Sequence, residues 1–198
     1  MWPWEHVAFG YVVYSLLVHL GYRDSPGESE AVTVAFASVL PDLIDKPLAW
    51  QFGIFESGYA LGHSIFFAGP LSLAAIVLAR ASGRTRVGLA FAVGYMLHLV
   101  GDVIPIYVAR GTWSVNHLLW PVVVVENPRG HDGLLAGFVH NFEPYVAQLL
   151  AGEVTPYIAL QVGLGLAAVG LWLFDGAPGV KAVRACVGRT VGLVRVVR

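Results

Sequence analysis

The sequence predicts an all-α protein: an integral membrane bundle of about five transmembrane helices with a polar metal site near its outer face. Two observations carry this prediction. The 198-residue chain is 57% hydrophobic and only 13% charged, whereas soluble domains carry roughly 25% charged residues. The chain also contains several apolar segments close to the length of about 20 residues that crosses a bilayer. We therefore expect one transmembrane helical domain over residues 1–178.

The first two expected helices are short. Residues 7–20 form an apolar run that follows two tryptophans, which are typical of the membrane interface. A charged stretch with turn residues, 21–30, separates this run from a second one at 31–40. The second run ends at Pro41, because the residue before a proline disfavours the helical conformation.

Three further membrane segments are expected downstream. Residues 59–79 form the third, and a basic turn at 80–86 leads directly into the fourth, 87–109. Residues 110–156 mix polar side chains with short apolar pieces, so we expect them to be extramembrane or half inserted. The fifth segment, 157–174, contains no charged residue.

The distribution of basic residues predicts the orientation of this bundle. Residues 179–198 form a basic, valine-rich tail of the kind that lies on an anionic membrane surface. With five spans, the tail lies on the same side as the 21–30 stretch and the 80–86 turn. The basic residues of that side are Arg23, Arg80, Arg84, Arg86, Lys181, Arg184, Arg189, Arg195 and Arg198, and those of the other side are Lys46, Arg110 and Arg129. The positive-inside rule makes the first side, with the C-terminus, cytoplasmic in a multi-pass protein of the cell membrane.

The fourth segment contains the two most unusual side chains, His98 and Asp102. A spacing of four residues places them on one helix face, and each is costly in hydrocarbon without a partner. A neutral imidazole and a carboxylate at this spacing can bind one cation. The alternative is a polar pair that hydrogen-bonds neighbouring helices.

Other polar residues fall at the same depth in this topology. His6 begins the first segment, Asp42 and Asp45 end the second, and His63 lies near the start of the third. All of these positions are on the extracytoplasmic side, in the same half of the bilayer as the His98 and Asp102 pair. The convergence favours a shared metal site over separate packing contacts.

The ligand types indicate what such a site would bind. Histidine and carboxylate ligands without cysteine suit a divalent transition metal, Zn above all, with Mn and Fe also possible. The number of candidates fits one ion with supporting partners or two ions. Both arrangements activate water for hydrolysis. The single cysteine, Cys186, excludes an intramolecular disulfide and a cysteine-based zinc site.

The ordered motifs resemble a known family. A histidine near the N-terminus is followed by Pro41-Asp42-x-x-Asp45, Gly62-His63-Ser64, His98-x-x-Gly101-Asp102 and Trp120-Pro121. Over about residues 1–125 this set resembles the membrane-bound metal-dependent hydrolases described as LexA-binding and inner-membrane-associated. In ligand order that family is similar to zinc-dependent phospholipase C and S1/P1 nuclease. The resemblance implies metal ligation by His6, Asp42, His63, His98 and Asp102, and a catalytic set of Asp42, Asp45, His98 and Asp102, with Asp45 supporting a ligand or replacing one.

The sequence departs from these families in two places. Tyr59-Ala60-Leu61-Gly62 stands before His63 where the hydrolase family usually has Arg and Thr, so a possible phosphate-binding arginine is missing. The phospholipase group has further His and Glu ligands downstream, for which this chain offers His117, His131, His140 and Glu143. We expect the three histidines to be solvated loop residues. No feature supports an association with LexA.

Two functions are compatible with these features. The first is a metal-dependent, phospholipase C-like hydrolase that acts on a phosphoester bond in a lipid-like substrate. The second is a non-catalytic membrane protein, either a metal-binding or transport component or a scaffold. Membrane lipid is the expected partner in both, and the absence of a basic patch with interleaved aromatics argues against a nucleic acid. The oligomeric state is left open.

Overall fold

The structure, a computed structural model, describes residues 1–126 and 133–184. These residues form helices and connecting turns without a strand, which confirms the all-α fold class. His131 and the part of the predicted basic tail at 185–198 lie outside the described residues. The helices are α1 (Pro3–Tyr22), α2 (Glu28–Ala37), α3 (Leu40–Lys46), η1 (Pro47–Gln51), α4 (Ile65–Ala81), α5 (Thr85–Arg110), η2 (Asn116–Leu118), α6 (Leu134–Leu150) and α7 (Pro156–Phe174).

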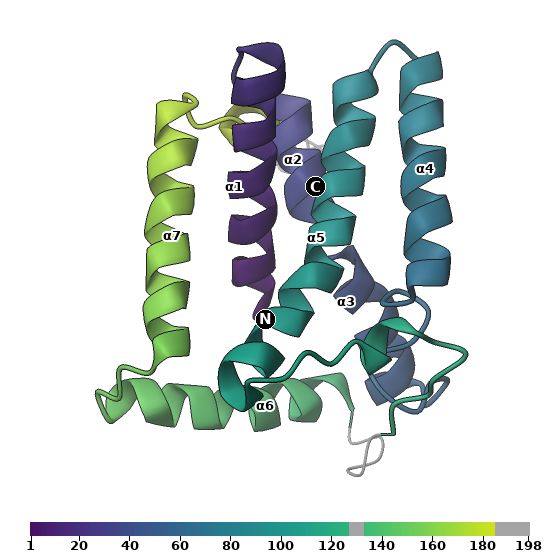
Figure 1. Cartoon of the computed structure of the whole chain (residues 1–198), viewed down its shortest axis with the longest axis vertical. Helices are drawn as coiled ribbons and strands as arrows, with labels where there is room; N and C mark the ends of the chain where they lie inside the picture. Colours follow the sequence, from purple (N-terminus) through teal and green to yellow (C-terminus); the bar gives the residue numbers. More distant parts are fainter. Residues whose placement is uncertain (127–132, 185–198) are drawn as a thin grey trace, which may run out of the picture.

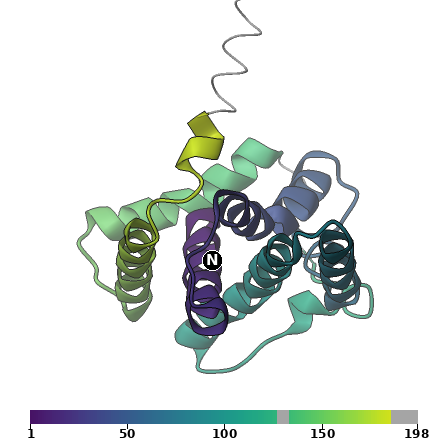
Figure 2. The ribbon, with the colours of Figure 1, turned by 90° about the horizontal axis from the view of Figure 1, so that it is seen from above.

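Helix α5 is the centre of the bundle and packs against α1, α2 and α4. Viewed from above, α7 and α4 lie at opposite sides, with α1, α2 and α5 between them (Figure 2). A small residue lets α2 approach α5 closely: a Cβ at Gly94 would lie 2.6 Å from the carbonyl oxygen of Val34. This contact brings the end of α2 against the middle of α5.

The connections between the helices gather at two ends of the bundle (Figure 1). The turns at 23–27 and 82–84 and the segment after α7 lie at one end, and the loops at 52–64 and 111–126 lie at the other. This grouping of connections is the one that the sequence predicts. Which end faces the cytoplasm stays a prediction.

Two of the five expected spans are supported by the structure. Among the described residues, Thr85–Val108 of α5 and Pro156–Phe174 of α7 are long and apolar enough to cross a membrane. Helix α2 has 10 residues, which at about 1.5 Å per residue extends for about 15 Å. The expected start of the third segment at residue 59 is wrong. Residues 59–64 form turns, and α4 begins at Ile65 and has 17 residues.

Helix α6 differs from the others in orientation. It lies across the end of the bundle, roughly perpendicular to α7, which begins shortly after it in the chain (Figure 1). None of its side chains is buried. Whether residues 110–156 are extramembrane or half inserted stays a prediction.

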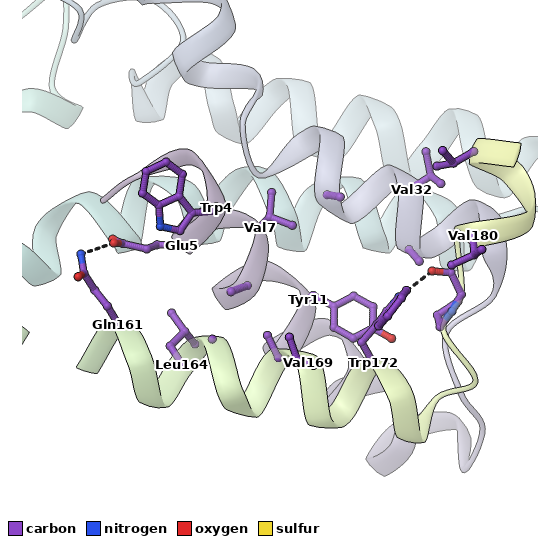
Figure 3. Close-up of a pocket in the computed structure, with 18 of the residues that line it drawn as sticks. Trp4, Glu5, Val7, Tyr11, Val32, Gln161, Leu164, Val169, Trp172 and Val180 are labelled. Atoms are coloured by element: carbon purple, nitrogen blue, oxygen red, sulfur yellow. Dashed lines mark hydrogen bonds between the residues drawn. The ribbon is translucent and has the colours of Figure 1, made fainter. Parts of the chain in front are cut away.

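Helix α7 is held to α1 near both of its ends. At its first turns, the buried carboxylate of Glu5 accepts hydrogen bonds from Tyr157 and Gln161. At its C-terminal end, Asp175 receives polar contacts from α1. Between these two contacts, an apolar groove of about 730 Å³ is lined by residues of α1, α2 and α7 (Figure 3).

Candidate metal centre

The structure brings together the five residues predicted as metal ligands. His6 comes from α1, Asp42 from α3, His63 from the turn before α4, and His98 and Asp102 from successive turns of α5. All five are buried, and the three histidines are essentially inaccessible to solvent. Residues separated by nearly 100 positions therefore meet at one point inside the bundle.

Four side-chain atoms form the centre of this cluster. The Nε2 atoms of His63 and His98 lie 3.1 Å apart. Asp42 Oδ1 lies 3.4 Å from the first and 3.7 Å from the second. Asp102 Oδ2 lies 3.3 Å and 3.6 Å from the same two nitrogens.

The hydrogen bonds behind the two imidazoles determine which nitrogen carries the proton. His98 Nδ1 lies 2.7 Å from the backbone carbonyl oxygen of Ser38, which can only accept, so Nδ1 is the donor. His63 Nδ1 likewise donates to the carboxylate of Asp45 at 2.8 Å. In the neutral rings both Nε2 atoms therefore present lone pairs to each other and to two carboxylate oxygens. Four acceptors in contact require a cation or an added proton between them.

The donors that do reach the two carboxylates contact their other oxygens. Lys46 Nζ lies 2.5 Å from Asp42 Oδ2, and the α-amino group of Met1 lies 2.8 Å from Asp102 Oδ1. Asp42 Oδ1 and Asp102 Oδ2, which face His63 and His98, receive no hydrogen bond from these two donors. Both carboxylates are fixed from outside and aimed inward.

Asp45 holds the loop that carries His63. Its carboxylate accepts backbone N–H bonds from Ala60, Gly62 and His63 as well as the imidazole N–H of His63. From the other side, the hydroxyl of Tyr95 on α5 donates to the carbonyl oxygen of Gly62 at 2.7 Å. Asp45 therefore lies behind His63, which matches the predicted supporting role and not that of a ligand.

His6 completes the cluster from the N-terminal helix. Its ring stacks on that of His98 with centroids 3.7 Å apart, and its Nε2 lies 3.1 Å from Asp102 Oδ1. Neither of its ring nitrogens has a well-formed hydrogen bond, although the side chain is fully buried. A Cβ at Gly101 would lie 3.0 Å from His6 Nδ1, so the absence of a side chain at 101 allows this approach.

The pKa shifts of His63 and Asp42 both favour a positive charge in the cluster. Burial alone would lower the pKa of His63, but the carboxylates of Asp102, Asp42 and Asp45 outweigh it and raise the pKa to about 10. Burial would raise the pKa of Asp42, yet the hydrogen bond with His63 and the charge of Lys46 hold it well below its usual value. Without a metal, the cluster takes up a proton as its cation.

The cluster offers two overlapping sets of ligands. His6, His98 and Asp102 form one set, and Asp42, His63 and His98 form the other, with the ligand atoms of each set within 4.8 Å of one another. His98 belongs to both. The donors fit the nitrogen and oxygen coordination of Zn, Mn or Fe.

The remaining sequence candidates lie elsewhere or play other parts. His140 and Glu143 are exposed on α6, away from the cluster. The prediction that His117 is a solvated loop residue is wrong: it is buried, and burial lowers its pKa. With Tyr59 and Asp102 it lines a cavity of about 460 Å³ beside the cluster.

Sequence reasoning also missed the part played by Tyr59. Its ring packs against His63 at 4.8 Å and His117 at 5.3 Å between centroids. It occupies part of the segment in which the resembling family usually has an arginine. The signal for His117 was available in the sequence, since it is an ionisable residue just before an apolar run, as His98 is within one.

Comparison with known proteins places the chain in a family. No curated protein and no solved structure matches it. A family model described as YdjM inner membrane protein matches residues 1–180, which is most of the chain. An inner-membrane family agrees with the apolar composition and the two candidate spans. The chain therefore belongs to the YdjM inner membrane protein family.

Proposed function

We propose that this protein is a membrane-embedded, metal-dependent hydrolase that acts on a phosphoester bond in a lipid-like substrate. The observation that carries the proposal is a set of four buried acceptor atoms. The Nε2 atoms of His63 and His98 lie 3.1 Å apart, and each lies 3.3–3.7 Å from one carboxylate oxygen of Asp42 and one of Asp102. Burying these groups is costly unless a bound cation compensates for it. The distribution of lysine and arginine supports an extracytoplasmic location for the site.

The residues of the chain have distinct parts in this proposal. Asp42 and Asp102 supply the negative charge, and His63 and His98 the nitrogen ligands, with Asp45 and the Ser38 carbonyl fixing both rings. A divalent cation in such a site lowers the pKa of a bound water toward about 7 and polarises a phosphoryl oxygen.

His117 is the residue placed to exchange a proton with a substrate. It lines the cavity that reaches Asp102, and its Nε2 has no hydrogen-bond partner among the described residues. A buried neutral imidazole at this position can accept a proton from water or deliver one to a leaving group. A substrate in the cavity would lie between this ring and the cluster.

Metal analysis combined with an activity assay tests the proposal. The full chain, purified in detergent, should contain at least one equivalent of a transition metal and hydrolyse bis-(4-nitrophenyl) phosphate or a phospholipid. Asp102→Asn should lose metal and reduce activity by about 100-fold or more. His140→Ala, which removes an exposed histidine on α6, is the matched control and should change neither.

Two results would contradict this function. A wild-type protein without stoichiometric metal would remove its chemical basis. A protein that holds metal, but whose activity on these substrates is unaffected by Asp102→Asn, would have a structural metal site. The second result would favour the metal-binding or scaffold alternative.

A further inference from the structure

A large, mostly apolar cavity lies between α6 and the metal centre. Its volume is about 830 Å³, within the range of roughly 300–1,000 Å³ that is typical of small-molecule sites. Asp42 and Lys46 form part of its wall, and the rest includes Trp50, Leu135, Phe138 and Tyr157. One wall of this cavity therefore contains a residue of the metal centre.

The helix that covers this cavity has the properties of a membrane-interface helix. Helix α6 runs across the end of the bundle, near the start of the candidate span α7 (Figure 1). Its aromatic residues Phe138, Phe142 and Tyr145 pack around Trp2, with ring centroids 5.2–6.1 Å apart. Aromatic side chains concentrate where hydrocarbon meets the headgroup layer. No side chain of α6 is buried, so the helix is a thin cover and not part of the core.

The charged side chains that line the cavity are those of Asp42 and Lys46. Lys46 is partly exposed and pairs with Asp42, whereas the α6 side is lined by Leu134, Leu135, Phe138 and Asn141. A ligand that matches this distribution has an anionic group beside Lys46 and the metal centre, and a hydrocarbon chain beneath α6. An acidic membrane lipid has this structure.

We propose that the cavity beneath α6 binds an acyl chain of an anionic phospholipid, with the phosphate held at Lys46 and the metal centre. The proposal deepens the hydrolase function and rests on it only for the position of the phosphate. The groove in Figure 3 is also apolar, but none of the five ligand residues lines it. The cavity beneath α6 has Asp42 in its wall, as the smaller cavity beside His117 has Asp102.

Photo-crosslinking in vesicles tests whether the cavity is occupied. The full chain is reconstituted in phosphatidylcholine vesicles that contain a trace of phosphatidic acid with a diazirine in its acyl chain. After illumination, mass spectrometry should locate labels in residues 43–51 and 134–141. Exposed residues of α7 outside the groove of Figure 3, such as Leu166 and Leu173, report labelling by bulk lipid and serve as the internal reference.

A matched pair of variants on α6 separates the cavity from the surface. Leu135→Trp places a larger side chain in the cavity wall and should reduce labelling of 43–51 at least fivefold relative to α7. Leu149→Trp adds the same side chain at a second exposed position of α6. Both leucines are exposed, but only Leu135 lines the cavity, so Leu149→Trp should leave labelling within twofold of wild type. Excess unlabelled phosphatidic acid should compete for the cavity, and uncharged diacylglycerol should not.

Equal labelling of 43–51 in wild type and Leu135→Trp would overturn the proposal, as would equal competition by diacylglycerol. Because the assay measures occupancy and not turnover, it is separable from the test of hydrolysis. An occupied cavity in a protein without activity would refute the hydrolase and leave the lipid site standing. An active enzyme with an unlabelled cavity would refute the lipid site and leave the hydrolase function standing.

Discussion

Two buried polar clusters along α1 differ in how their hydrogen-bonding groups are matched. At one end, Asp175 Oδ2 accepts from the hydroxyls of Tyr11 and Ser15, each at 2.7 Å, and Asp175 Oδ1 lies 2.6 Å from His19 Nε2. Every contact in this Asp175 cluster pairs an acceptor with a donor. At the other end, in the metal centre, the Nε2 atoms of two histidines and the oxygens of two aspartates face one another, and in the neutral rings all of these atoms are hydrogen-bond acceptors.

The comparison shows that burial of ionisable groups does not by itself indicate a functional site. Each polar group of the Asp175 cluster has a partner within the cluster, and the cluster joins α7 to α1, so we assign it a structural role. With neutral rings, the metal centre has no donor between its four central acceptors and needs a metal ion or an added proton there. The balance of donors and acceptors separates two clusters that both combine histidine with aspartate, and four predictions test that distinction.

The largest expected effect comes from the histidine shared by both ligand sets. His98→Ala should abolish metal binding, because each set includes His98. His6→Ala removes a ligand from one set only and should leave the ion held by Asp42, His63 and His98. Elemental analysis of both purified variants gives the number of ions per chain, and equal loss in both would point to a single shared ion.

Removal of the metal should destabilise the protein substantially. A ligand present at about 1,000 times its dissociation constant stabilises the folded state by about 4 kcal/mol, and this contribution is lost when the metal is removed. Prolonged dialysis against a chelator, followed by denaturant unfolding, should lower the midpoint, and re-addition of Zn should restore it. An unchanged midpoint would mean that the centre is as balanced as the Asp175 cluster.

A smaller effect is expected from the group behind His63. Asp45→Asn keeps the size of the side chain but weakens its bond to His63 Nδ1, and such supporting partners typically contribute 10–100-fold to metal affinity. Competition with a chromogenic chelator measures this change. Asp24→Asn, at an exposed aspartate far from the centre, is the control and should leave affinity unaltered.

The smallest effect is expected at the Asp175 cluster. Asp175→Ala leaves two hydroxyls without their acceptor and should cost about 1–3 kcal/mol of unfolding free energy at pH 7, with metal content unchanged. Burial would raise the pKa of Asp175, but hydrogen bonds from Ser15, Tyr11 and His19 outweigh it and lower the pKa. Because the folded-state pKa is lowered, the carboxylate stabilises the protein above the unfolded-state value of about 3.9.

That stabilisation is lost as the pH falls through the lowered folded-state pKa. The difference in stability between wild type and Asp175→Ala should therefore narrow in acid. Unfolding titrations at pH 7 and at about pH 3 measure it. A difference that grows toward acid would contradict the assignment of Asp175 as a stabilising carboxylate.

The site was more predictable from the sequence than the membrane topology. The five candidate ligands share one signal, an ionisable residue at the end of an apolar run or inside one, and this signal does not depend on exact helix boundaries. Hydropathy alone overestimated the spans, because α2 is short and residues 59–64 form turns. The carbonyl of Ser38 could not be predicted at all, since any residue supplies a carbonyl and only the crossing at Gly94 selects this one.

Hydropathy also treats α5 and α7 as equivalent, although their surroundings differ. Half of the apolar window of α5 is buried, against 11% of that of α7. The glycines of α5 meet neighbouring helices at close range, whereas Gly163, Gly165 and Gly170 of α7 face open space. Glycine content therefore does not reveal which apolar helix is central, while the histidine and aspartate of α5 do.

The complete burial of the histidine ligands has a consequence for how the protein would select its metal. A cation bound by these histidines would leave toward the cavities lined by Asp42 and Asp102, and detachment from fully buried side chains would make that step slow. Such slow exchange would preserve the first cation captured as the helices pack, even where another divalent ion binds more tightly at equilibrium. The bound metal would then be the one most available in the compartment in which the chain folded.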